Sequence, residues 1–148
     1  MASGTTAVAT VGSSTGFVSG VTAGTAVITY TLSGGCFVTQ AVTVSTAPST
    51  ITGTASVCTG STTTLSSSPS GGTWTSGTTA VATVGSSTGV VSGVSAGTAV
   101  ITYTLSGGCF VTQAVTVSTA PSAITGTASV CTGSTTALSS SPSGGTWT

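Results

Sequence analysis

The sequence predicts an all-β protein made of antiparallel β-sandwich units repeated in tandem, with essentially no helix. Gly, Ser and Pro punctuate the chain at intervals of about ten residues, and the segments between them are rich in β-branched residues, which is typical of a sandwich. No segment places apolar residues with the 3.6-residue period of an amphipathic helix. The chain also repeats itself over nearly its whole length.

The repeat has a period of 73 residues, because residues 3–75 align without a gap with residues 76–148 (76 − 3 = 73). This period is longer than the 20–50 residues of solenoid repeats, so each copy is expected to be a small globular domain. The positions that differ are Phe17/Val90, Thr22/Ser95, Thr50/Ala123 and Thr64/Ala137.

The junction between domains is expected in the segment Ser-Thr-Ala-Pro-Ser, which occurs at 45–49 and again at 118–122. It follows a strong strand pattern, and its proline lacks the backbone donor that a central strand needs. Residues 48–120 are then one complete domain. Residues 3–47 are the C-terminal part of a preceding domain, and residues 121–148 are the N-terminal part of a following one.

Seven strands are expected in the complete domain. The strand over 98–105 places Ala99, Ile101, Tyr103 and Leu105 on one face, and the strand over 110–118 places valines on one face. A turn at 106–108 joins these two strands as a hairpin. The other expected strands are 51–57, 62–67, 73–75, 80–84 and 90–92. The expected core residues are Leu65, Trp74, Ile101, Tyr103, Leu105, Val115 and Val117.

The chain contains no Lys, Arg, Asp, Glu or His, although ordinary domains are about a quarter charged. General acid–base catalysis needs a poised carboxylate, His or Lys, so no catalytic residue is expected and the protein is predicted not to be an enzyme. Carboxylates for calcium and Lys or Arg for nucleic acid are absent as well. We therefore expect no metal, no cofactor and no nucleic-acid partner. Apolar runs are too short for a membrane helix, so no membrane insertion is expected, and Met1 opens no signal peptide.

The segments Ala-Val-Ala-Thr-Val-Gly at 80–85 and Gly-Val-Val-Ser-Gly-Val-Ser-Ala-Gly-Thr-Ala-Val-Ile-Thr-Tyr at 89–103 resemble the bacterial Ig-like group 2 domain. The cysteine-bearing segments 57–61 and 107–109 are similar to Ig-like repeats of large secreted Bacteroidetes proteins. The resemblance implies an Ig-like fold and an extracellular or cell-surface role in spacing and adhesion. The absence of every charged residue departs from the family and puts its usual surface contacts in doubt.

Four cysteines without a histidine favour disulfides over a metal site in an extracellular β-domain. Cys58 and Cys109 lie in the same complete domain and are expected to pair. Cys58 lies at the end of the first expected strand and Cys109 at the start of the last. A sandwich can also place these two points at opposite ends of the domain, and that arrangement favours a disulfide between neighbouring domains. Cys36 and Cys131 are expected to pair where complementary half-domains meet, between different chains.

The main functional hypothesis is a structural subunit, or a repeat window, of an extracellular filament. Residues 121–148 of one chain complete residues 3–47 of the next, as in donor-strand exchange, and a head-to-tail contact of this kind propagates. The expected partners are therefore copies of the chain itself and, in addition, an unidentified surface ligand. The alternatives are a stalk or spacer of a cell-surface adhesin, an ice- or surface-binding repeat, and a cross-β amyloid.

Overall fold

The computed structural model describes residues 2–148, and within this range every regular element is a β-strand. No helix in these residues is long and apolar enough to cross a membrane. Backbone contacts divide the chain into two units. The first comprises the chain up to Thr50 together with Ser67–Thr73 and Tyr103–Val111, and the second comprises Ile51–Ser66, Trp74–Thr102 and Thr112–Thr148.

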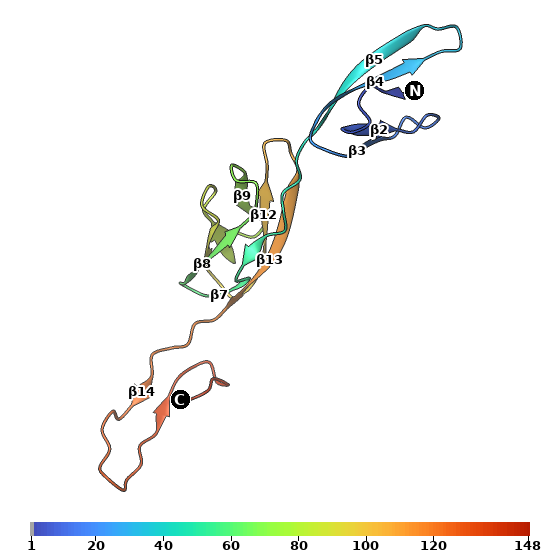
Figure 1. Ribbon diagram of the computed structural model, residues 1–148. Coiled ribbons are helices and arrows are strands. Elements are labelled where there is room, and N and C mark those ends of the chain that lie inside the picture. The colour runs from blue at the N-terminus through green and yellow to red at the C-terminus, as the bar shows by residue number, and fades with distance from the viewer. Residues whose placement is uncertain (1) are drawn as a thin grey trace. The chain divides into compact units, whose positions relative to one another are not determined.

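The first unit contains a three-stranded sheet in the order β1-β4-β5 and a two-stranded sheet of β2 and β3 (Figure 1). β4 and β5 form a long antiparallel hairpin in which Gly24 lies opposite Val44 and Thr31 lies opposite Phe37. The described side chains that are buried in this unit before Thr50 are those of Ala9, Ala26 and Ile28. The strands are β1 (Ala2–Ser3), β2 (Ala9–Val11), β3 (Val18–Gly20), β4 (Gly24–Thr31) and β5 (Phe37–Val44).

The second unit contains most of a sandwich with one sheet in the order β10-β11-β8-β6 and another in the order β7-β13-β12-β9 (Figure 1). The strands of the first sheet pair antiparallel, whereas β7 pairs parallel with β13 in the second. The strands of this sandwich are β6 (Thr52–Gly53), β7 (Ser56–Cys58), β8 (Thr62–Ser66), β9 (Thr73–Ser76), β10 (Ala82–Val84), β11 (Val90–Gly93), β12 (Gly97–Thr104) and β13 (Phe110–Ser118). One end of β9, of β12 and of β13 falls in the first unit. A two-stranded sheet of β14 (Thr125–Gly126) and β15 (Leu138–Ser139) follows.

The structure divides the strand expected over 51–57 into two, and the two pieces join different sheets. Thr52 and Gly53 pair with β8, whereas Ser56–Cys58 pairs with β13. The chain turns at Gly53, whose φ of 119° lies in the region that side chains avoid. A Cβ there would also lie 2.5 Å from the carbonyl oxygen of Thr64. Only glycine therefore allows this first strand to serve both layers of the sandwich.

The side chains expected in the core are placed as follows. Leu65, Trp74, Ile101, Tyr103, Val115 and Val117 are buried, and Leu105 is half-buried at the end of its strand. On β12 the alternation holds, because Ala99, Ile101 and Tyr103 point inward while Val100 is exposed. The buried side chains among the described residues are all of hydrophobic type, and Tyr103 and Trp74 bring the polar groups of their rings into the core.

Candidate self-assembly site

The repeat provides an internal control, because the same residue types occur in a complete copy and in incomplete ones. We call residues 48–120 the complete copy, residues 3–47 the N-terminal part and residues 121–148 the C-terminal part. Tyr103 in the complete copy is 3% exposed, whereas its equivalent Tyr30 in the N-terminal part is 49% exposed. Val91 is fully buried and its equivalent Val18 is exposed. The N-terminal part therefore presents an apolar face that the complete copy covers.

This difference is confined to certain positions and does not affect every pair of equivalent residues. Phe37 and Phe110 are equivalent residues at the start of the last strand, and both are exposed to nearly the same extent, 66% and 65%. Val27 and Val100 also match, at 46% each. These exposed residues are thus alike in both copies, whereas Tyr30 and Val18, whose equivalents are core residues, are more exposed.

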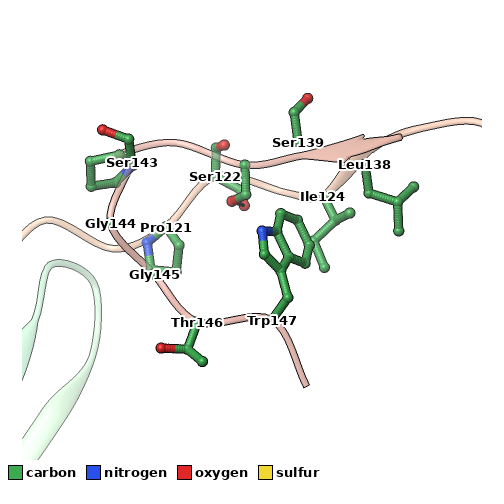
Figure 2. Close-up of a pocket in the computed structure, with 12 residues that line it drawn as sticks. Pro121, Ser122, Ile124, Leu138, Ser139, Ser143, Gly144, Gly145, Thr146 and Trp147 are labelled. Carbon is green, nitrogen blue, oxygen red and sulfur yellow. Dashed lines mark hydrogen bonds between the residues drawn. The ribbon is translucent and has the colours of Figure 1, made fainter. Parts of the chain in front are cut away.

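The C-terminal part is the sequence that covers this face in the complete copy, since it is equivalent to residues 48–75. Here all its residues are exposed except the half-buried Ser140. Trp147 is 58% exposed, whereas its equivalent Trp74 is 5% exposed. Figure 2 shows the Trp147 ring beside Ile124, with Leu138 on the neighbouring strand, around a pocket of about 520 Å³.

The C-terminal part retains some hydrogen bonds of the complete copy, although the equivalents of β7 and β9 form no strand in it. The Ser140 hydroxyl donates to the Ser122 carbonyl over 2.8 Å, as Ser67 donates to Ser49 over 2.8 Å. The Thr125 hydroxyl donates to the Ser139 carbonyl over 3.3 Å, as in the equivalent pair of the complete copy. These bonds hold the turn at 140–142 and the short β14–β15 pair in the arrangement of their equivalents.

The complete copy shows what fills the equivalent of the pocket. The Tyr103 hydroxyl donates to the Pro69 carbonyl oxygen over 2.8 Å and accepts from the Gly72 backbone N–H over 2.8 Å. A Cβ on Gly72 would lie 2.5 Å from Cζ of the tyrosine ring. The corresponding lining residues in the C-terminal part are Pro142 and Gly145, and a Cβ on Gly145 meets nothing within 4 Å.

The strand pairings of the complete copy involve segments whose equivalents fall in both parts. In the complete copy, β11 pairs antiparallel with β8 through Val91 and Thr63. In the second sheet, β13 pairs parallel with β7, and Val117 lies opposite Val57. The equivalents of β8 and β7 fall in the C-terminal part, while β3 and β5 carry the equivalent receiving edges. Exposed edges of this kind are templates for pairing with another chain.

The four cysteines are free thiols in the structure. Cys58 lies opposite Ser118, the last residue of β13, whereas Cys109 precedes its first residue, Phe110. The 9 residues of β13 span about 30 Å at 3.3 Å per residue, and a disulfide needs Cα atoms about 4.4–6.8 Å apart. The expected Cys58–Cys109 bond within one domain must therefore be corrected, because β13 separates the two residues by its whole length.

The sequence prediction missed Gly145 and Tyr30 as members of this site, although both follow from adding or subtracting 73 from a residue of the complete copy. Nothing in their own neighbourhood singles them out, since a glycine in a Ser/Gly turn is unremarkable. Among residues 2–148, no group of three or more His, Cys, Asp or Glu residues is placed to hold a metal ion.

No family model and no curated protein matches this chain. Among solved structures, a C-terminal 282-residue fragment of intimin, crystallised with the intimin-binding domain of its translocated receptor Tir, is similar with 20% identity and a TM-score of 0.48. The S-layer protein SbsC is similar with 29% identity and a TM-score of 0.34 for its 31–844 fragment, and with 26% and 0.34 for domains 1–6.

The chain overlaps these structures over 74%, 79% and 86% of its own length and spans only 44%, 19% and 21% of theirs. With TM-scores below 0.5, these overlaps carry no weight for the function. The assignment of an all-β sandwich therefore stands on the sheets described above.

Proposed function

We propose that this protein is a non-enzymatic structural repeat of an extracellular filament, in which the C-terminal part of one copy completes the N-terminal part of the next. The observation that carries the proposal is the burial difference between equivalent residues, above all Tyr103 and Tyr30. The complete copy is itself the template for the interface, because it contains both halves in one chain.

The template assigns the contacts of the assembled state. Tyr30 of the receiving copy enters the pocket of the donating copy, where its hydroxyl donates to the Pro142 carbonyl and accepts from the Gly145 N–H. Val18 pairs with Thr136 on one edge, and Val44 pairs with Val130 on the other. Each aliphatic side chain that becomes fully buried contributes about 1.5–3 kcal/mol, and the aromatic rings bury more area still.

The composition supports self-association. A surface without charged side chains has no electrostatic repulsion between identical units, and a net charge near zero promotes association. The contact joins the C-terminal part of one copy to the N-terminal part of another. An assembly of any length therefore still has a free N-terminal part at one end and a free C-terminal part at the other. Such a contact propagates into an open filament unless it closes into a ring.

Gly145→Ala tests the proposal. The substitution meets nothing within 4 Å in the free chain, and Gly145 does not have a positive φ. In the assembled state the new methyl group collides with the ring of Tyr30, as the equivalent Cβ on Gly72 would with Tyr103. Overpacking of this kind costs about 1–3 kcal/mol, so the critical concentration for assembly rises at least about fivefold.

The matched control is Gly4→Ala. A Cβ at Gly4 lies 3.6 Å from the Val27 carbonyl oxygen, and its equivalent at Gly77 lies 3.5 Å from Val100, which is ordinary contact in either state. Both variants are examined by electron microscopy and sedimentation. Filaments of Gly145→Ala at the wild-type critical concentration would overturn the proposed interface.

The stalk or spacer of a cell-surface adhesin is the second candidate. It is favoured by the points at which the chain enters and leaves the complete copy. The chain enters beside the turn at Ser68 and leaves after the last residue of β13. Copies joined in this way extend in series. Discrete wild-type monomers at micromolar concentration would contradict the filament and favour the spacer.

A further inference from the structure

Cys109 lies against the linker that precedes the complete copy. Its Sγ atom is 3.9 Å from the carbonyl oxygen of Ser45, and it is the least exposed of the four cysteines. Ser45 is the repeat equivalent of Ser118, since the two are 73 positions apart (118 − 45 = 73). The surroundings of Ser118 therefore show what accompanies Ser45 when its own domain is complete.

Beside Ser118 lies a cysteine. Cys58 is the register partner of Ser118 in the parallel pairing of β7 with β13. The next residue, Thr59, donates its backbone N–H to the Ser118 carbonyl oxygen over 2.8 Å. Neighbouring strands are about 4.8 Å apart, so the residue in the position of Cys58 lies one strand away from the serine.

Combining the two observations places two cysteines at the same junction. Resting on the proposed function, we infer that Cys131 of the donating copy lies beside Ser45 of the receiving copy and forms a disulfide with Cys109 of that receiving copy. Residues 121–148 of the donating copy and residues 3–47 of the receiving copy together form a completed domain, in which Cys36 takes the position of Cys109. This Cys36 therefore pairs with Cys58 of the donating copy, which lies in the domain that precedes it. Two disulfides then join each pair of successive copies.

This assignment replaces the expected Cys36–Cys131 pair. Cys36 and Cys131 are the equivalents of Cys109 and Cys58, which the full length of β13 keeps apart. In the completed domain they consequently lie at opposite ends of β5. Cys131 instead lies near Cys109 of the following domain, and Cys36 lies near Cys58 of the preceding domain.

The oxidation needs an electron acceptor, and a low-molecular-weight disulfide supplies it. One cysteine thiolate attacks this disulfide, forms a mixed disulfide and expels one small thiolate. The second cysteine thiolate attacks the protein sulfur of the mixed disulfide and expels the other. Two protein thiols are oxidised to one disulfide, the small disulfide is reduced to two thiols, and the two protons lost by the cysteines pass through solvent to the thiols released.

Two double variants separate this pairing from its alternative. Cys36→Ser/Cys58→Ser retains Cys109 and Cys131, whereas Cys58→Ser/Cys109→Ser retains Cys36 and Cys131. Each is assembled under reducing conditions, oxidised with oxidised glutathione and run on a denaturing gel without reductant. The first variant is expected to give a ladder of covalent oligomers that reductant collapses to monomer, and the second to remain almost wholly monomeric.

Electron microscopy before oxidation keeps the two proposals distinguishable. If neither the wild type nor the variants form filaments under reducing conditions, the proposed function fails. If filaments form but Cys36→Ser/Cys58→Ser gives no ladder, the inferred disulfide alone is overturned. A ladder from Cys58→Ser/Cys109→Ser that equals that of the first variant would also overturn it, because the pairing would then be unspecific.

Discussion

The Tyr103 hydroxyl donates a 2.8 Å hydrogen bond to the Pro69 carbonyl oxygen, and so fastens the penultimate strand of the sandwich to the turn before β9. The two residues are separated by 34 positions in the chain. In the N-terminal part the equivalent tyrosine is present, while the equivalent proline lies 112 positions further along, at Pro142 (142 − 30 = 112). The proposed assembly forms this bond between two copies.

Tyr30→Phe is expected to weaken assembly without affecting the stability of the chain. Tyr30 is half exposed in the free chain, and the substitution removes only the hydroxyl that bonds to Pro142 in the filament. A hydrogen bond of this kind contributes about 1 kcal/mol, which corresponds to about a fivefold higher critical concentration. Sedimentation of assembled material measures the change.

Tyr103→Phe is the matched control at the equivalent position. It removes a bond that is internal to the complete copy, so it lowers the melting temperature of the free chain. Equal losses of melting temperature from both substitutions would contradict the assigned role of Tyr30.

Trp147 is expected to report assembly by its fluorescence. It is 58% exposed in the free chain, and in the filament it takes the environment of Trp74, which is 5% exposed. The emission maximum should therefore shift to shorter wavelength, and most of the quenching by acrylamide should be lost, because Trp74 is already buried and Trp147 accounts for most of the accessible emission. An unchanged spectrum in sedimented filaments would place their interface elsewhere.

Assembly is expected to be nearly independent of sodium chloride. No Lys, Arg, Asp, Glu or His is available, so screening has no side-chain charges to act on between about 10 mM and about 1 M salt. Sulfate strengthens burial of apolar surface and should lower the critical concentration. Light scattering against salt concentration provides the measurement, and a tenfold dependence on sodium chloride would contradict an apolar interface.

Much of the fold could be predicted because the chain repeats itself and its strands alternate. The strand over 110–118 was predicted with the same bounds as β13, and that over 98–105 differs from β12 by one residue at each end. The division of 51–57 between two sheets was missed. Alternation of side chains does not reveal a change of sheet, and the decisive feature is the backbone conformation of Gly53.

The candidate site was predictable only in outline. The sequence indicated that the two incomplete parts complement one another, but not which residues meet, since that depends on which strands are neighbours. The cysteine pairing shows the limit most clearly. A strand of 9 residues separates Cys58 from Cys109, and order along the sequence does not disclose that β7 runs parallel to β13.

The parallel pairing of β7 with β13 has a mechanical consequence. The chain approaches the start of β7 from one end of the complete copy and leaves from the last residue of β13 at the other. Tension along the chain therefore pulls these two strands in opposite directions along their length. The pairing joins three residues of each strand, so the load falls on its interstrand bonds together and does not open them one after another. Resistance to stretching should therefore depend on this short pairing more than on the small core.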